Sequence, residues 1–447
     1  MRVAVIGAGW AGCAAAVEAV RRGHEVTLYE SARTPGGRAR RVESVLPAEN
    51  PAPVTLDNGQ HILIGAYAET LRLMAELGVD EKTALLRLPL TLRFPDGSGI
   101  RFPMHAWLPA PLDALVGIAT AHGWTWRDRL SMLRAATGWQ LRGFRCAPQT
   151  PVADLCSGLS AGAMAQLIEP LCVSALNTPP DRASGQVFLR VLRDALFSAS
   201  GGSNLLLPRK DLGALLPDAA LAWLSTHGGA VRLGLRVQSI ARDQHAAAGT
   251  GAWSVSTDTD PRSPLRFGAV LLACPPGEAA RLAVPAASTD DDPVQTWASL
   301  ARSLKHEAIT TVYALAPGAR LAQPMLALRS GANYPAQFVF DRGQLGGPDG
   351  LLAFVVSASH GDSATLASQV LAQAGEQLGL MQLEAVQTIV EKRATFACTP
   401  GLQRPGMEIT DGLLACGDYI EGPYPATLEG AVMSGLAAAK ALTPKKP

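Results

Sequence analysis

A glycine-rich turn near the amino terminus constrains the fold of this chain more than any other feature. Val3 to Ile6 form a short apolar run, which predicts a buried parallel strand, and a tight turn follows at Gly7-Ala8-Gly9. The chain from Ala11 to Arg22 is rich in alanine and lacks proline, and Gly23 stands where a helix C′ residue is needed. A second strand is expected from Glu25 to Tyr29. The sequence therefore predicts a strand-helix-strand unit that opens an α/β domain.

Gly7, Gly9 and Gly12 form a GxGxxG pattern at this turn. Gly7 permits the turn, Gly9 lets backbone N–H groups approach a pyrophosphate, and Gly12 lets helix and strand pack closely. The helix N-terminus favours the phosphate charge. Glu30 lies 18 residues beyond Gly12, near the spacing of about 20 residues expected for a carboxylate that accepts from a ribose 2′-OH. The pattern predicts a dinucleotide site, with a purely structural glycine turn as the weaker alternative.

A second glycine pair distinguishes between dinucleotides. In PGGRARR, Gly36 and Gly37 allow close backbone approach, and Arg38 supplies a fixed fork for a phosphate or a flavin carbonyl. A domain that binds only NAD has no evident use for this pair. The carboxyl-terminal segment supplies a further part: a strand is expected from Leu413 to Cys416, followed by Gly417-Asp418. A small-residue helix is expected from Thr427 to Leu442. Both ends of the chain are therefore expected to build one cofactor site.

These motifs resemble those of a known family. The order of GxGxxG, an acidic strand end, GGR, and a late Gly-Asp followed by EGAxxSGxxAA resembles the flavin amine oxidase and phytoene desaturase superfamily. Within it, LDNGQHILIGAY at 56–67 and GDYIEGPYPATLEGAVMSG at 417–435 resemble the squalene-associated FAD-dependent desaturases, the hydroxysqualene dehydroxylases of bacterial hopanoid biosynthesis. The likeness covers essentially the whole chain.

The resemblance implies FAD as the cofactor and an α/β fold. In that fold a Rossmann-like FAD-binding domain of the GR2 type is interleaved with a mixed-sheet substrate domain and a helical insert. It implies that Val237 reaches the adenine side of FAD by its backbone. Thr427, Leu428 and Glu429, at the start of the flavin-facing helix, are expected cofactor contacts, Glu429 at the ribityl chain or the flavin.

The expected domains alternate along the 447 residues, which are too many for one ordinary core. The FAD-binding domain is expected at 1–85, 201–285 and 396–447. The substrate domain is expected at 86–200, where a helical insert starts near residue 111, and at 286–395 as a sheet. A hairpin is predicted over 90–102 around Asp96-Gly97, and a helix over 211–227.

The composition of the chain limits the classes of partner that it is expected to bind. A net charge of +1 gives no basic footprint for nucleic acid. Hydrophobic residues make up 48% and charged residues 17%, which favours an apolar substrate or membrane contact. No run of about 18 apolar residues occurs, and Met1 leads directly into the first strand, so neither a spanning helix nor a signal peptide is predicted. We expect a cytoplasmic protein in peripheral contact with the inner membrane face through its helical insert.

The cysteines and histidines predict no metal site. The seven cysteines show no CxxC spacing, which is typical of structural thiols in a reducing cytosol. The eight histidines show no HExxH pattern.

The catalytic candidates come from the two diagnostic stretches. In the dehydroxylation that the resemblance implies, an allylic C30 alcohol loses water and gains a hydride from reduced flavin, which requires a proton donor and a dry cavity. His61, Glu421 and Tyr424 are the candidates for the acid. His61 has an intrinsic pKa suited to proton donation, but a structural role that orients the DNGQH turn is the favoured alternative. For Asp57 a turn-forming role is expected. Trp124, Trp126 and Trp139 are candidates for lining an isoprenoid channel or for packing in the core.

Three functions remain open at this stage. The first is a hydroxysqualene dehydroxylase-like flavoenzyme, and the second is a carotenoid-type desaturase or an amine oxidase. The third is a prenyl-lipid carrier without flavin chemistry, against which the intact glycines, Glu30, Arg38 and Asp418 argue. The expected partners are a long-chain isoprenoid substrate, an unknown electron donor and, as candidates, the preceding squalene-pathway synthases.

Overall fold

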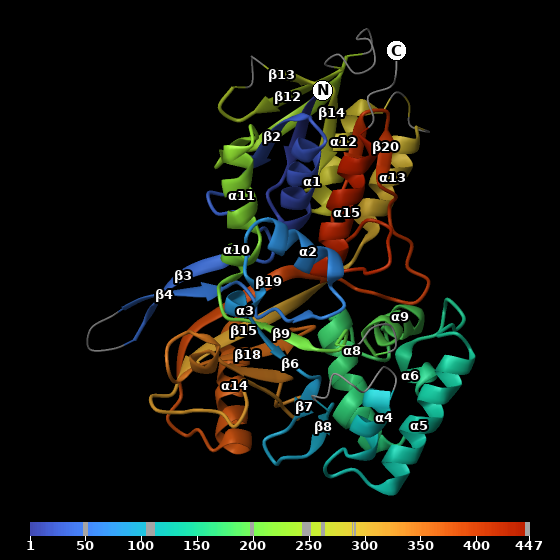
Figure 1. Ribbon diagram of the computed structural model, residues 1–447, viewed down its shortest axis with the longest axis vertical. Helices are drawn as coiled ribbons and strands as arrows, with labels where there is room; N and C mark the ends of the chain where they lie inside the picture. The colour runs from blue at the N-terminus through green and yellow to red at the C-terminus, as the bar shows by residue number, and fades with distance from the viewer. Residues whose placement is uncertain are drawn as a thin grey trace.

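The computed structural model describes residues 1–47, 52–103, 112–196, 201–243, 252–260, 264–287, 289 and 292–442. Two halves, each built on a sheet, lie one above the other along the long axis (Figure 1). We call them the parallel-sheet half, which holds both ends of the described chain, and the antiparallel-sheet half. The helical insert lies beside the second half.

The parallel-sheet half is built from segments far apart in the sequence. Its strands, in spatial order, are β10 (Ala230–Leu233), β2 (Glu25–Glu30), β1 (Arg2–Ile6), β14 (Ala269–Leu272), β21 (Leu413–Ala415) and β20 (Glu408–Thr410). All neighbours pair in parallel except β20, which runs antiparallel to β21.

Layers cover both faces of this sheet because its central strands are apolar on both sides. Val3 and Val5 of β1 belong to the core formed with α1 (Trp10–Arg21), α11 (Pro217–Thr226) and α15 (Leu428–Ala441). Ala4 and Ile6 belong to a core on the other face. That face is covered by α12, α13 and a three-stranded sheet, with bounds α12 (Pro276–Ala283), α13 (Pro293–Ser303), β11 (Val237–Arg242), β12 (Trp253–Thr257) and β13 (Leu265–Phe267).

The antiparallel-sheet half contains a five-stranded sheet. Its strands, in order, are β16 (Met325–Ala327), β17 (Phe338–Asp341), β18 (Leu351–Ser357), β15 (His306–Leu315) and β19 (Glu384–Phe396). Helix α14 (Ser363–Leu378) covers one face through Leu366 and Val370. The other face carries Phe338, Phe340 and Val355 and turns toward the centre of the molecule.

The helical insert follows the hairpin of β7 (Thr91–Arg93) and β8 (Gly99–Arg101), which the sequence predicted. Its elements are α4 (Leu112–Ala119), α5 (Trp126–Leu141), α6 (Val152–Leu155), α7 (Ala161–Ala163), the π-helix η1 (Met164–Ile168), α8 (Glu169–Leu176) and α9 (Gly185–Leu196). Thr125 caps α5 reciprocally with Asp128, which fixes where that long helix begins.

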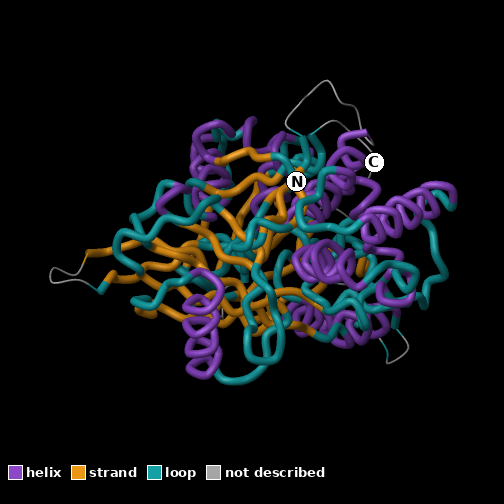
Figure 2. Tube along the Cα trace, turned by 90° about the horizontal axis from the view of Figure 1, so that it is seen from below, coloured by secondary structure: helices purple, strands orange, loops and turns teal. Residues whose placement is uncertain are grey.

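Smaller elements join the two halves. They are β3 (Arg41–Leu46), β4 (Ala52–Asp57), β5 (Leu63–Ile64), α2 (Ala68–Glu76), α3 (Glu81–Ala84), β6 (Leu85–Leu88), β9 (Leu205–Pro208), α10 (Leu212–Leu215), and the short 3₁₀ turns η2 (Val284–Ala286) and η3 (Gly343–Leu345). Strands β3 and β4 pair with each other and project from the body (Figure 2).

Two details differ from the sequence-based expectation. The single helix predicted over 211–227 is two helices, because Pro217 lacks the N–H that would continue α10 and instead starts α11. Helix α13 lies within the segment expected for the substrate sheet. It packs on α12 and β20 of the parallel-sheet half instead.

Candidate active site

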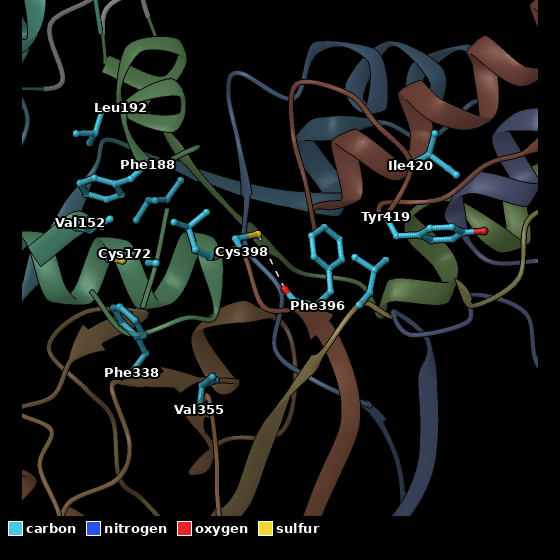
Figure 3. Close-up of a cluster of buried hydrophobic side chains, with 14 of the residues drawn as sticks. Val152, Cys172, Phe188, Leu192, Phe338, Val355, Phe396, Cys398, Tyr419 and Ile420 are labelled. Atoms are coloured by element: carbon cyan, nitrogen blue, oxygen red, sulfur yellow. Dashed lines mark hydrogen bonds between the residues drawn. The ribbon is translucent and has the colours of Figure 1, made fainter. Parts of the chain in front are cut away.

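A cavity of about 1110 Å³ lies where the two halves meet. At one end its wall is formed by the turns after β1 and β2 and by the start of α15. At the other end apolar side chains from α8, α9 and the five-stranded sheet form the wall. Figure 3 shows Phe188 and Leu192 of α9 on one side of this end, and Phe338 and Val355 of the sheet on the other. The cavity is therefore polar at one end and apolar at the other.

The first glycine turn has the form of a phosphate cradle. Gly7 has φ +111°, a conformation that favours glycine, and Gly9 is the N-cap of α1. A Cβ on Gly12 would lie 1.8 Å from the carbonyl oxygen of Gly7, so only glycine allows α1 this close to the turn. A Cβ on Gly9 would meet only the Cα of Gly37, at 4.0 Å. The space beside Gly9 is thus open cavity.

Glu30 stands at the end of β2 and lines the cavity. Its Oε2 accepts a hydrogen bond from the backbone N–H of Ala8 at 2.8 Å, and its Oε1 accepts one from the N–H of Ala32 at 2.8 Å. The carboxylate therefore orders the glycine turn. Oε1 also accepts from Ser31 Oγ at 3.2 Å, whereas Oε2 has a second lone pair with which Glu30 can accept from a ribose hydroxyl.

The second glycine pair packs against the first turn. Gly36 donates its N–H to the carbonyl of Ala8 at 2.9 Å. Gly36 and Gly37 have φ of +108° and +61°. Arg38 also lines the cavity, but its fork is not open as the sequence suggested: it forms an ion pair with Asp418 and donates to the carbonyl of Ala394 at 2.9 Å. The guanidinium therefore joins the second turn to β19 and to the loop after β21.

The carboxyl-terminal segment completes the polar end. Gly417 and Asp418 line the cavity, and the N–H of Gly417 donates to Ser434 Oγ at 3.0 Å. Thr427 caps α15 by accepting from the N–H of Gly430 at 3.0 Å. Thr427 and Leu428 lie at the cavity wall, so the positive end of the α15 dipole is directed at the same space as that of α1.

Glu429 does not take the place that the sequence suggested. It is buried and outside the cavity lining. Its two oxygens accept from the N–H groups of Glu69 and Thr70, both at 2.9 Å, and Oε2 also accepts from Thr70 Oγ1 at 2.7 Å. Both N–H groups belong to the first turn of α2, where no carbonyl of the helix itself is available to accept from them. The expectation of a flavin contact is therefore corrected: Glu429 fixes α2 onto α15.

Val237 is the first residue of β11 and lines the cavity together with Leu235 and Arg236. The pairing of β11 with β12 is irregular directly after Val237. Two residues before this strand, the N–H of Leu235 donates to the carbonyl of Glu30 at 2.9 Å, which places the segment beside the end of β2. A backbone contact from Val237 to adenine remains a prediction.

His61 lines the cavity, and its hydrogen bonding determines its tautomer. Nδ1 lies 2.8 Å from the carbonyl oxygen of Gly59, an acceptor, so Nδ1 carries the proton and donates. Burial lowers the pKa of His61 below its ordinary value of 6.5. At neutral pH the ring is therefore uncharged and Nε2 is an acceptor, so this geometry favours the orienting role over that of a proton donor.

The other two acid candidates lie in different surroundings. Glu421 is exposed and outside the cavity lining, so the structure does not bring it to the site. Tyr424 lines the cavity and hydrogen-bonds to Asp194 of α9. Burial and the Asp194 carboxylate raise the pKa of Tyr424, which keeps its phenol protonated. Arg190 lies over the Tyr424 ring, 5.9 Å from its centre.

Asp57 is fully buried beneath the site. Its Oδ1 accepts from the N–H of Leu212, the first residue of α10, at 2.8 Å. Burial raises its pKa to about 6. The expected role in the DNGQH turn is thus replaced by a contact with α10, and it is the next residue, Asn58, that lines the cavity.

Sequence reasoning missed several residues at the site. Asn58 and Gln60 lie inside the DNGQH motif, and that motif was the available signal for them. Gln60 Nε2 is a buried donor without a hydrogen-bond partner in the described structure. Glu391 and Arg393 of β19 line the cavity as well. They stand in the charged stretch EKRATF at 391–396, which carries no local motif of a binding site.

The three tryptophans have different environments. Trp139 helps line a second, small and wholly apolar cavity of about 30 Å³ under α4 and α5. That cavity shares Leu90, Leu171 and Leu192 with the wall of the large one. Trp124 is buried in the core, and Trp126 is 81% exposed.

The described residues contain no group of three or more potential metal ligands. All seven cysteines are free. Among the helices in the described ranges, none combines the length and the apolar character that crossing a bilayer requires.

The residues at the polar end fit a dinucleotide. The open space beside Gly9, the helix ends of α1 and α15, and the carboxylate of Glu30 match the pyrophosphate and the ribose of FAD. The fold and this site define the class of protein, an FAD-dependent oxidoreductase.

Comparisons with known proteins agree. Residues 10–443 match the family described as flavin containing amine oxidoreductase, and the chain belongs to that family. A protein named hydroxysqualene dehydroxylase from Rhodopseudomonas palustris is 29% identical over 462 aligned residues, which cover 98% of this chain and 97% of that protein. A probable zeta-carotene desaturase from Synechococcus elongatus is 28% identical over 54% of this chain and 51% of its own length. The crystal structure of an oxidoreductase from Methanosarcina mazei has a TM-score of 0.70 at 17% identity, covering 98% of this chain and all of that one.

Proposed function

We propose that this enzyme converts hydroxysqualene to squalene by reductive dehydroxylation. The observation that carries the proposal is the cavity, whose FAD-fitting end opens onto a wall of Phe188, Leu192, Phe338 and Val355. Such a wall suits a hydrocarbon chain. The resemblance over nearly the whole length to proteins named hydroxysqualene dehydroxylase supports this reaction. The carotene desaturase match covers about half of the chain and supports the related oxidative reaction less well.

The reaction balances as an alcohol plus a proton plus a hydride giving a hydrocarbon plus water. Reduced FAD, when bound, supplies the hydride. The chain supplies orientation and dryness: the apolar wall excludes bulk water, and Gln60 Nε2, the buried donor without a partner, is suited to hold the hydroxyl oxygen of the substrate.

The test is an anaerobic incubation of the photoreduced enzyme with hydroxysqualene. Photoreduction removes the need for the unknown electron donor. Formation of squalene in step with flavin reoxidation is the expected result. If squalene fails to appear while a polyene substrate reduces the oxidised flavin, the desaturase function replaces this one. Protein that purifies without flavin would favour a carrier.

We also propose that the helical insert contacts the inner face of the membrane. Trp126, Leu130 and Leu141 are exposed and lie on one side of α5, and the exposed Arg127 and Arg134 border them. Apolar and aromatic residues with arginine are typical of helices that lie on anionic lipid. The inner faces of α4 and α5 line the small apolar cavity next to the large one, so this surface is close to where an insoluble chain would enter.

Binding to vesicles tests that placement. Replacing Trp126, Leu130 and Leu141 by serine should release the protein from vesicles that contain phosphatidylglycerol, with flavin content unchanged. Replacing the exposed Met381, which lies beyond α14, is the matched control. Equal binding of the triple variant and the parent would contradict the placement. Residues 104–111, which join β8 to α4, lie outside the described residues.

A further inference from the structure

A carboxylate of β19, that of Glu391, lines the cavity beside a break in the pairing of this strand. On β15, Glu307 and Ile309 are two residues apart, but their partners on β19, Thr395 and Glu391, are four apart. The extra residues form a bulge. Glu391, Arg393 and Thr395 alternate along β19 and therefore share the face that lines the cavity, and at the bulge the intervening Ala394 lines it as well.

Asn58 holds this carboxylate in place. The Asn58 side chain is buried, and both ends of its amide are fixed, since Oδ1 accepts from the N–H of Arg40 at 3.0 Å and Nδ2 donates to the carbonyl of Arg38 at 2.9 Å. The same Nδ2 lies 3.4 Å from Glu391 Oε2. Arg40 Nη1 lies 3.8 Å from that oxygen. Only Oε2 is engaged, and among the described residues no group hydrogen-bonds to Oε1.

The surroundings of Glu391 suit its carboxylate to stabilise positive charge on a ligand. His61 on the same wall is uncharged, and the Arg40 guanidinium approaches Glu391 at Oε2, at 3.8 Å. Ile309 pairs directly with Glu391 and also lines the cavity. A negative charge beside an apolar chain stabilises positive charge that develops on that chain, and the effect is strong where water is excluded.

We propose that Glu391 is a catalytic residue that stabilises the allylic cation formed as the C–O bond of the substrate breaks. This inference rests on the proposed dehydroxylation. The electron pair of the C–O bond leaves with the oxygen, which takes up a proton from solvent and departs as water. Reduced FAD, when bound, would supply the hydride that forms the new C–H bond. Glu391 forms no bond, and its charge lowers the barrier to heterolysis.

A charged mimic of the cation separates this role from mere packing. The probes are a long-chain isoprenoid ammonium compound and the neutral alcohol of the same length, each titrated into oxidised holoenzyme and followed by the flavin absorbance. Glu391→Gln should weaken ammonium binding about 10- to 100-fold, and neutral binding should stay within about twofold. Glu391→Asp, which keeps the charge, should restore part of the ammonium preference. Glu384→Gln, at the exposed start of the same strand, should change neither.

Two results would overturn the inference. An equal loss of both probes in Glu391→Gln would show that Glu391 only shapes the cavity. Unchanged ammonium binding would show that its charge does not face the ligand. These results are independent of the proposed reaction, because failure of the parent enzyme to form squalene rejects dehydroxylation while the ammonium preference is still measured. If squalene does form, single turnover of photoreduced Glu391→Gln should be slower by about 10²-fold per flavin.

Discussion

The two ends of the cavity are built on different principles. The polar end consists of backbone groups and helix ends supplied by short contiguous turns at 7–12, 36–38 and 417–418. The apolar end consists of side chains from α8, α9, β15, β17 and β18, which are far apart in the sequence. Contiguous backbone sites leave local sequence signatures, whereas assembled side-chain sites do not. The difference explains why the cofactor is easier to infer than the substrate.

The largest effects are expected from substitutions of Gly12 and Gly9, two glycines of the same turn that should respond differently. Gly12→Val should prevent folding, because its Cβ would lie 1.8 Å from the Gly7 carbonyl oxygen. Gly9→Val should fold but bind no FAD, because its side chain meets little protein and fills the cradle. Circular dichroism and flavin content measure the two outcomes. A Gly9→Val protein with full flavin would refute the cradle assignment.

The next prediction concerns Asp57, which lies under the site without lining it. Its pKa is raised to about 6 by burial, above the ordinary 3.8, so the folded state binds the extra proton between these values. Its contribution to stability is therefore favourable at low pH and is lost as the pH rises through 6. Asp57→Asn keeps an acceptor for Leu212 and should stabilise the protein at pH 8 by up to about 3 kcal/mol. Denaturant unfolding at pH 4 should show almost no gain, and the same gain at both pH values would exclude this explanation.

Variants of Glu30 test how strongly FAD binding at the polar end depends on a side chain. Glu30→Ala should weaken FAD binding by about 1–3 kcal/mol through loss of a charge-assisted hydrogen bond. The N–H groups of Ala8 and Ala32 would also lose their acceptors. Glu30→Gln, with one acceptor oxygen left, should lose less. Flavin titration of the apoproteins measures both, and equal affinity in all three proteins would show that Glu30 does not contact the ribose.

The smallest effect is expected for His61. A general acid at this position would contribute about 10²–10⁴-fold. The lowered pKa and the Nδ1–H bond to Gly59 predict instead that His61→Ala lowers stability and flavin occupancy, while squalene formation per bound flavin stays within a few-fold of the parent. Single-turnover rates normalised to flavin distinguish the two. A hundredfold lower rate of squalene formation per flavin would instead support His61 as the general acid.

The sequence predicted the parallel-sheet half in more detail than the rest. The strand, turn and helix at 2–21 and the helix at 428–441 follow from glycine placement and periodicity, and outside this half the hairpin at 91–101 follows from its turn residues. The break at Pro217 was available in the sequence and was overlooked.

The substrate end could not be derived in the same way. Glu391 and Asn58 are 333 residues apart in the sequence, and only the folded sheet brings them together. The placement of Glu391 beside Ile309 depends on pairing between two distant strands. The capping role of Glu429 depends on α2, a partner that no local pattern indicates.

The strand order of the parallel sheet also determines the order in which its strands can pair during biosynthesis. Strand β1 gains its partner β14 only after residue 269 has been made, β14 gains β21 only after residue 413, and α15 is the last described helix to emerge from the ribosome. Pairing over such separations is slow, and unpaired strand edges are exposed until it occurs. Because the cradle needs both α1 and α15, a nascent chain cannot close around FAD before its carboxyl-terminal segment is released. A chain that ends before α15 would therefore lack one wall of the cofactor site.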